Sequence, residues 1–318
     1  MKRLYHTIAS AILILFLLPV QVQAVQMLIP GGQVVGLQLQ NGSLTVAAYD
    51  DDLGCVPREA GLKIGDELLS INGEAVSSPE EVRAALSDAR AVFLKVRRSG
   101  KVTTLSLTPC PTEEGPRLGV YLRQGIAGIG TVTFYDPSTG LFGTLGHGVS
   151  NGDGEILPMK TGSAFAAEVL SVKKGKTGTP GQLKGEAGQV LGSLLKNTPQ
   201  GVFGRSEIPF PGEALPTAAY NEIQPGSATI RSTVCGGGVQ EYSVEILKIY
   251  PQTRQDGRNF LLKVTDPALL NTTGGIVQGM SGSPICQNGK IVGAVTHVLV
   301  NDPTMGYGIF IDNMLDAA

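Results

Sequence analysis

The sequence has no tryptophan, only three histidines and four cysteines among 318 residues, and only 16% charged side chains. The 25 basic and 27 acidic residues nearly balance, which argues against a nucleic-acid partner, because such a protein needs a basic face to neutralise phosphates. Cys-x-x-C pairs and Cys/His clusters are missing, so neither a metal site nor a cofactor is expected.

Glycine, proline and apolar residues are plentiful instead. The chain has 43 glycines, 19 prolines and 42% hydrophobic residues. Short runs of Val, Ile, Leu and Thr between tight turns indicate a mainly β protein, and the length suggests about two domains.

Residues 1–24 have the order of an export segment. Lys2 and Arg3 precede an apolar run from Ile8 to Val20, and Val22-Gln23-Ala24 offers small residues for a signal peptidase. The run is shorter than the ~20 residues of a spanning helix, so a cleaved signal peptide and an uncleaved membrane anchor both stay open. Either way, we expect the body of the chain outside the cytosol.

An exported chain can form disulfides between its four cysteines. We expect Cys55 to pair with Cys110 and Cys235 with Cys286, only because the two members of each pair lie in the same expected domain.

Residues 27–108 are expected to form a compact α+β module. Its apolar runs 34–39 and 44–48 flank Asn41-Gly42, which is typical of a hairpin turn. Ser78-Pro79-Glu80-Glu81 predicts the start of a helix with a capping box.

This module resembles a PDZ domain. The resemblance rests on Pro57-Arg58-Glu59-Ala60-Gly61-Leu62-Lys63-Ile64-Gly65-Asp66-Glu67-Leu68-Leu69-Ser70-Ile71-Asn72-Gly73, the bacterial pattern of a small-residue turn followed by GL..GD.I..ING. PDZ domains bind peptide termini or extended segments by adding a strand beside a helix. We expect that groove next to the strand after Gly36, with Val35, Gly36 and Leu37 as the peptide-binding residues.

The polar, proline-containing junction 110–116 predicts a domain boundary, and residues 115–318 read as β-rich to the end. Strands are expected at the following positions: 131–135, 243–250, 260–265 and 290–300. The last of these follows an Asn288-Gly289 hairpin turn.

Gly279-Met280-Ser281-Gly282-Ser283-Pro284 carries the sharpest chemical signal. Acyl transfer needs a hydroxyl on a tight turn with backbone N–H groups beside it, and flanking glycines permit that turn. Ser281 is therefore the predicted nucleophile, and the N–H groups of Gly279 and Ser281 are the predicted oxyanion hole. An ordinary Gly/Ser turn is the alternative.

A serine nucleophile needs a base, and His6 lies in the export segment. His147 stands in Gly146-His147-Gly148, whereas His297 lies in an alternating run typical of a strand. His147 is the preferred base, and His297 is the alternative.

The third member of a triad is a carboxylate that fixes the imidazole tautomer. The candidates are Asp266 in Thr265-Asp266-Pro267, Asp153, Asp136 and Asp302. An Asp-Pro is also typical of a turn cap, so spacing alone does not choose between them.

Taken together, an exported PDZ module followed by Gly-His-Gly, Thr-Asp-Pro and Gly-Met-Ser-Gly-Ser-Pro-Ile resembles the SpoIVB peptidases of sporulation signalling. Gly293-Ala294-Val295-Thr296-His297-Val298 and Gly306-Tyr307-Gly308 add to the likeness. It implies a chymotrypsin-like double β-barrel with the triad His147, Asp266 and Ser281. One departure is that Asp266 lies only 15 residues before Ser281, much closer than in ordinary chymotrypsin-like enzymes.

The resemblance also implies a regulatory serine endopeptidase, released into the space between the two membranes around the forespore. It cleaves itself near its N-terminus and cuts a membrane regulator of an intramembrane metalloprotease, which leads to activation of the late mother-cell sigma factor K. The PDZ domain is expected to recognise the chain itself and its substrate. A general envelope quality-control PDZ protease and a non-catalytic PDZ binding protein are the alternatives.

Overall fold

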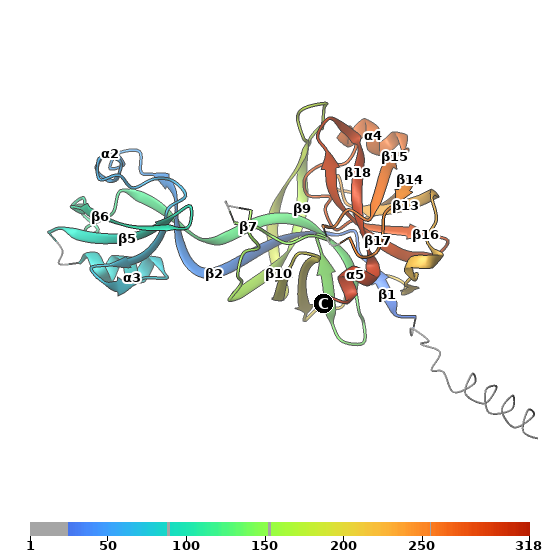
Figure 1. Ribbon diagram of the computed structural model, residues 1–318, viewed down its shortest axis with the longest axis horizontal. Coiled ribbons are helices and arrows are strands. Elements are labelled where there is room, and N and C mark those ends of the chain that lie inside the picture. The colour runs from blue at the N-terminus through green and yellow to red at the C-terminus, as the bar shows by residue number, and fades with distance from the viewer. Residues whose placement is uncertain (1–24, 88–89, 152–153, 255) are drawn as a thin grey trace, which may run out of the picture.

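The computed structural model describes residues 25–318, except 88–89, 152–153 and 255 (Figure 1). The predicted export segment lies outside the described residues. Within the described part of the chain, no helix is long and apolar enough to cross a membrane.

A first barrel closes through six strands. The ring consists of β2 (Val34–Tyr49), β7 (Val120–Tyr135), β8 (Leu141–Thr144), β11 (Gly201–Ser206), β10 (Gln182–Thr198) and β9 (Thr161–Lys173), which returns to β2. β1 (Met27–Pro30) pairs with β7 and with β12 (Leu215–Pro216). Val35, Leu37, Phe142 and Val202 are fully or almost fully buried inside this barrel.

A second barrel follows in the chain. Its closed order is β13 (Gly226–Ser232), β14 (Gln240–Ile249), β15 (Phe260–Val264), β18 (Asp302–Phe310), β17 (Lys290–Leu299) and β16 (Pro284–Gln287). η1 (Tyr220–Glu222), α4 (Pro267–Thr273) and α5 (Ile311–Leu315) flank these strands. Phe260 and Phe310 meet edge to face in the core, with ring centroids 4.6 Å apart. The expected chymotrypsin-like double β-barrel is confirmed.

The PDZ module projects from the first barrel, at the left of Figure 1. It contains α2 (Cys55–Glu59), β3 (Glu67–Ile71), β4 (Glu74–Ala75), α3 (Pro79–Leu86), β5 (Val92–Arg98) and β6 (Lys101–Leu107). The predicted helix start is confirmed, because Ser78 caps α3 by accepting a hydrogen bond from the N–H of Glu81. Asp66 of the PDZ pattern is 1% exposed and takes two hydrogen bonds of 2.6 Å from Arg98, so its role is structural.

The predicted boundaries of the two domains need correction. Residues 34–40 of β2 lie between β7 and β9 in the first barrel, whereas residues 120–124 of β7 pair with β2 in the PDZ module. Leu118 is buried in the PDZ core. The PDZ module is therefore inserted between two long strands, β2 and β7, that also build the first barrel, as Figure 1 shows.

The hairpin predicted at Asn41-Gly42 is wrong. The chain continues through these residues as the single strand β2, and its register against β7 shifts between Leu39 and Leu44. Gly42 has a φ of 75°, which suits a bulge as well as a hairpin.

The disulfides paired by domain membership are not present. Cys55 and Cys235 are exposed free thiols, and Cys110 and Cys286 are buried free thiols.

Candidate active site

The turn that carries Ser281 precedes β16 of the second barrel and is fixed from both sides. The Met280 side chain is fully buried in the core of this barrel. The N–H of Gly282 donates to the carbonyl of Val295 on β17 over 2.7 Å. A Cβ on Gly282 would lie 2.0 Å from the carbonyl oxygen of Thr131, so only glycine permits this approach to the first barrel.

Two threonines of β7 hold the same turn from the first barrel. Thr131 donates its hydroxyl to the carbonyl of Gly279 over 2.8 Å, and Thr133 donates its hydroxyl to the carbonyl of Gly282 over 2.8 Å. Both threonines are fully buried. No sequence motif marks them, because their partners are almost 150 residues further along the chain.

His147 lies just after β8 of the first barrel and, with Ser281 of the second barrel, lines a cleft between the barrels. This cleft has a volume of about 460 Å³, and His147, Ser281 and His297 all line it. Its other walls are mainly apolar and include Leu37, Leu39, Ile126, Ile129, Val149, Ile276, Val277 and Val298. Of the described residues in this lining, none is an aspartate or glutamate.

A hydrogen bond to the backbone indicates the tautomer of His147. Its Nδ1 lies 2.9 Å from the carbonyl oxygen of Gly148. A carbonyl can only accept, so Nδ1 carries the proton and Nε2 keeps the lone pair that a general base needs. Burial lowers the pKa of His147 below its ordinary value of 6.5, and the hydrogen bond to Gly148 acts in the opposite direction.

His297 on β17 is the neighbour of His147, with ring centroids 5.2 Å apart. The pKa of His297 is lowered to about 4, mainly by burial and also by the adjacent His147 and Arg258, while Asp256 acts against them. His297 is therefore neutral near pH 7. Its Nδ1 is buried without a hydrogen-bond partner among the described residues.

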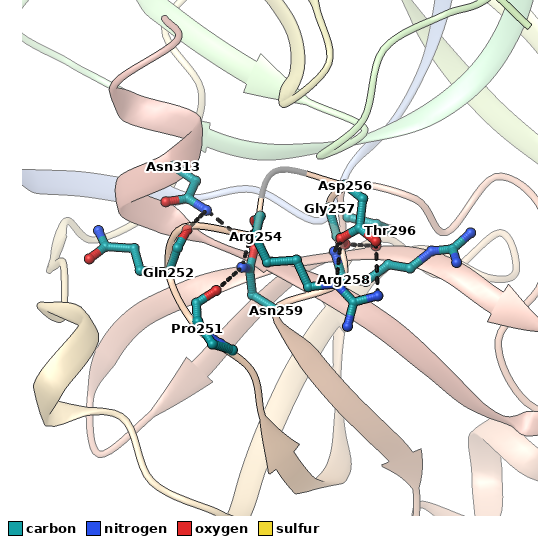
Figure 2. Close-up of polar contacts among 9 residues, drawn as sticks. All are labelled: Pro251, Gln252, Arg254, Asp256, Gly257, Arg258, Asn259, Thr296 and Asn313. Carbon is teal, nitrogen blue, oxygen red and sulfur yellow. Dashed lines mark hydrogen bonds and ion pairs between the residues drawn. The ribbon is translucent and has the colours of Figure 1, made fainter.

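Thr296 joins the nucleophile to the loop between β14 and β15. The hydroxyl of Ser281 donates to the Thr296 carbonyl over 2.9 Å, and the Thr296 hydroxyl donates to the carbonyl of Gly257 over 2.6 Å. Figure 2 shows this loop, in which Arg254 forms two hydrogen bonds with Asp256. The buried Asn259 donates to the carbonyls of Pro251 and Arg254, which closes the loop on itself.

The structure places Asp266, the predicted third member of the triad, outside the lining of the cleft that His147 and Ser281 share, and its part in the triad stays a prediction. Asp266 is the N-cap of α4, where Oδ1 accepts from the N–H groups of Ala268 and Leu269 over 2.9 and 3.0 Å. Its Oδ2 accepts from the N–H of Ser243 over 3.3 Å. These hydrogen bonds use both carboxylate oxygens, and Asp266 does not line the cleft.

The other aspartates weighed as candidates behave in a similar way. The carboxylate of Asp136 accepts hydrogen bonds from Ser138 and Thr139, and that of Asp302 accepts them from Thr304. Both are turn caps. Asp153 lies outside the described residues.

The backbone N–H groups of the turn differ in whether they are hydrogen-bonded. The N–H groups of Met280, Gly282 and Ser283 are bonded within the barrel, whereas those of Gly279 and Ser281 find no acceptor among the described residues. The second hydroxyl of the turn, that of Ser283, is fully buried against Ser232. The turn thus leaves Ser281 and two N–H groups for chemistry.

The peptide groove predicted at Val35, Gly36 and Leu37 is wrong. All three residues pair with β7 on one side and with β9 on the other, so neither edge can accept an added strand. Val35 is fully buried and Leu37 is 3% exposed in the core of the first barrel.

A groove of about 380 Å³ lies instead between α3 and the start of β7. Pro79, Val82, Arg83 and Leu86 of α3 line one wall, and residues 116–122 line the other. Residues 120–124 pair with β2 along one edge only, and no described strand occupies their other edge. A helix beside an open strand edge is the arrangement that binds a peptide by strand addition.

Family models match most of the described chain. The model described as SpoIVB peptidase S55 matches residues 114–315, and a PDZ domain model matches residues 54–98.

Individual relatives are more distant. A protein of Agrobacterium fabrum named as a putative zinc metalloprotease is 36% identical over 74 residues, which are 23% of this chain and 20% of that protein. The chain thus spans about a fifth of the length of this curated relative. Two crystal structures of the Rv3671c protease are also similar. The inactive form has a TM-score of 0.36 at 14% identity and covers 59% of this chain and 81% of its own. The active form, from M. tuberculosis, has a TM-score of 0.35 at 15% identity and covers 60% and 72%.

Proposed function

The chain belongs to the SpoIVB peptidase S55 family and is a serine peptidase, and from this premise we propose that it is an exported endopeptidase of sporulation signalling. Its proposed substrates are its own chain and a membrane regulator whose cleavage leads to activation of the late mother-cell sigma factor K. Family membership supports this role, and the predicted export segment supports a site of action outside the cytosol.

We assign the chemistry to Ser281 and His147. The observation that carries the assignment is that the two barrels each supply one of these residues to one cleft, with Nε2 of His147 free to accept a proton. The Ser281 oxygen attacks the peptide carbonyl while its proton passes to Nε2, and the N–H groups of Gly279 and Ser281 stabilise the oxyanion. The C–N bond then breaks, the amine leaves with that proton, and water releases the acyl group by the same route.

The resting hydroxyl of Ser281 points to the carbonyl of Thr296 rather than to His147. A rotation about its Cα–Cβ bond redirects it, and hydrogen bonds of this kind commonly tighten only when substrate is bound.

The PDZ groove beside α3 is proposed to hold an extended segment of the substrate. A bound segment is concentrated near the cleft without any change in the acyl-transfer step.

Sequencing of cleavage products tests this function. The purified protein is incubated alone and with a membrane extract, beside a Ser281→Ala variant, and new N-termini are identified by mass spectrometry. Cuts near its own N-terminus and in one membrane protein, both missing in the variant, support the proposal. Broad cutting of many unfolded proteins would indicate a protease of envelope quality control. If no cut depended on Ser281, the result would favour a non-catalytic PDZ binding protein.

A further inference from the structure

The proposed oxyanion hole fixes where the substrate residue before the cut bond lies. The carbonyl oxygen of that residue binds the N–H groups of Gly279 and Ser281, and the Ser281 oxygen attacks its carbonyl carbon. Its side chain branches from the neighbouring Cα, so it lies beside the segment that leads into Gly279 and beside the part of β17 next to Ser281. On β17, the carbonyl of Thr296 is 2.9 Å from the Ser281 hydroxyl.

Three branched aliphatic side chains line the cleft at this place. They are Ile276 and Val277, just before Gly279, and Val298, two residues after Thr296 on β17. Ile276 and Val277 are buried in the core of the second barrel, and Val298 is partly buried and packs against the same core. An aliphatic substrate side chain gains by leaving water for these walls, whereas a charged one would lose its hydration against them.

Ile276 fills the space behind this part of the cleft. Gly306 on β18 pairs with Val298 on β17. A Cβ on Gly306 would lie 2.5 Å from Cδ1 of Ile276 and 2.6 Å from the carbonyl oxygen of His297. The isoleucine side chain therefore occupies the room that this glycine leaves beside β17, and it limits how deep a substrate side chain can reach.

The segment 276–278 is held in place from the first barrel. The N–H of Gln278 donates to the carbonyl of Gly181 over 3.0 Å, and its carbonyl accepts from the N–H of Leu183 over 2.8 Å. A Cβ on Gly181 would lie 2.5 Å from Cγ1 of Val277, so the two chains are in close contact. This wall of the cleft is thus fixed on both sides and cannot move aside for a large side chain.

We propose that the peptidase cuts after small aliphatic residues, alanine or valine, and that Ile276 is the specificity-determining residue that sets the size limit. The inference rests on the proposed roles of Ser281 and His147 and names the class of substrate on which they act. Val277 and Val298 supply the apolar walls, and the acyl-transfer step is unchanged.

A series of acetylated tetrapeptide p-nitroanilides that differ only in the last residue gives the first test. That residue is alanine, valine, leucine, phenylalanine, lysine or glutamate, and kcat/KM is measured for each. The alanine and valine substrates should exceed the phenylalanine, lysine and glutamate substrates at least tenfold, because a pocket discriminates by about 10- to 200-fold for each methylene that does not fit. A phenylalanine or lysine substrate within threefold of the valine substrate would overturn the inference.

Ile276→Ala provides the second test. It deepens the cleft, so the ratio of kcat/KM for the leucine substrate to that for the alanine substrate should rise at least tenfold. A general loss of folded protein lowers both rates together and leaves this ratio unchanged. Ile246→Ala on β14 is the matched control, because Ile246 is fully buried in the same core and does not line the cleft. A wild-type ratio in folded Ile276→Ala would overturn the inference.

Val298→Ala decides the question if Ile276→Ala does not fold, since Val298 is only partly buried. The same ratio should rise about threefold, and an unchanged ratio would overturn the inference. Cleavage sites mapped in the membrane extract give the ranking on whole proteins, where large or charged residues before most cuts would also contradict it. If Ser281→Ala cuts the anilides as fast as the wild type, the proposed function has failed instead.

Discussion

Thr131 donates its backbone N–H to the carbonyl of Ser281 over 2.9 Å and its hydroxyl to the carbonyl of Gly279 over 2.8 Å. One residue of the first barrel therefore fixes two peptide groups of the nucleophile turn, which belongs to the second barrel. The two carbonyls belong to Gly279 and Ser281, the residues whose N–H groups form the proposed oxyanion hole. The relative placement of the barrels and the direction of those donors thus depend on the same contact.

We expect Thr131→Val to lower kcat about tenfold with little effect on KM, a fraction of the ~10²–10³-fold cost of losing an oxyanion donor outright. Valine has nearly the same shape but leaves the buried Gly279 carbonyl without its donor, which should also cost about 1–3 kcal/mol of unfolding free energy. Steady-state kinetics and chemical denaturation measure both. Thr133→Val is the matched control, because its hydroxyl binds Gly282, on the far side of Ser281; an equal kcat loss there would show that only stability matters.

Ser281→Ala and His147→Ala should each abolish ester hydrolysis and self-cleavage without unfolding the chain. Both side chains border an open cleft rather than a packed core. Because members of a catalytic group act as a unit, the double variant should be no slower than either single variant. Kinetics on the three proteins test this expectation, and a further large loss in the double variant would mean that the two residues do not share one mechanism.

Acidification should destabilise the protein between about pH 6.5 and pH 4. The pKa of folded His297 lies at about 4, below its ordinary value of 6.5, and that of His147 is lowered in the same direction. In this window the unfolded chain binds protons that the folded chain does not, so the free energy of unfolding falls as pH falls. Thermal unfolding at a series of pH values measures the effect. His297→Asn should flatten this dependence, and an unchanged slope in that variant would contradict the assignment.

The groove beside α3 should recognise peptides through strand addition. Arg83 lines it with a side chain that is 78% exposed, so Arg83→Glu should leave the fold intact. The peptides to be tested have a free carboxyl end and are selected from a random heptapeptide display library. Reversing the charge of Arg83 should weaken their binding by about tenfold, which corresponds to 1.4 kcal/mol. Fluorescence anisotropy measures the affinity. Lys95→Glu on β5 is the control, since Lys95 is exposed and does not line the groove; equal losses in both variants would indicate a non-specific charge effect.

The sequence by itself determined the features that depend on local backbone chemistry. Gly279, Ser281 and Gly282 predict a tight turn with a central hydroxyl, and the structure contains that turn. The Asn288-Gly289 hairpin and the cap of α3 by Ser78 follow from neighbouring residues in the same way. The cap at Asp266 follows from neighbouring residues too, because an aspartate followed by proline is a typical helix start.

Only the tertiary structure decided which strands pair. Asn41-Gly42 permits either a hairpin or a bulge, since both need a positive φ, and the choice depends on whether residues 44–49 fold back or continue along β7. They continue, which places Val35 to Leu37 in the first barrel and gives the PDZ groove its edge from β7. Thr131 acts through a partner 148 residues away, so no local pattern marks it. Contacts between distant segments are fixed by packing of the whole chain, and that packing assembled the site from turns that the sequence had already defined.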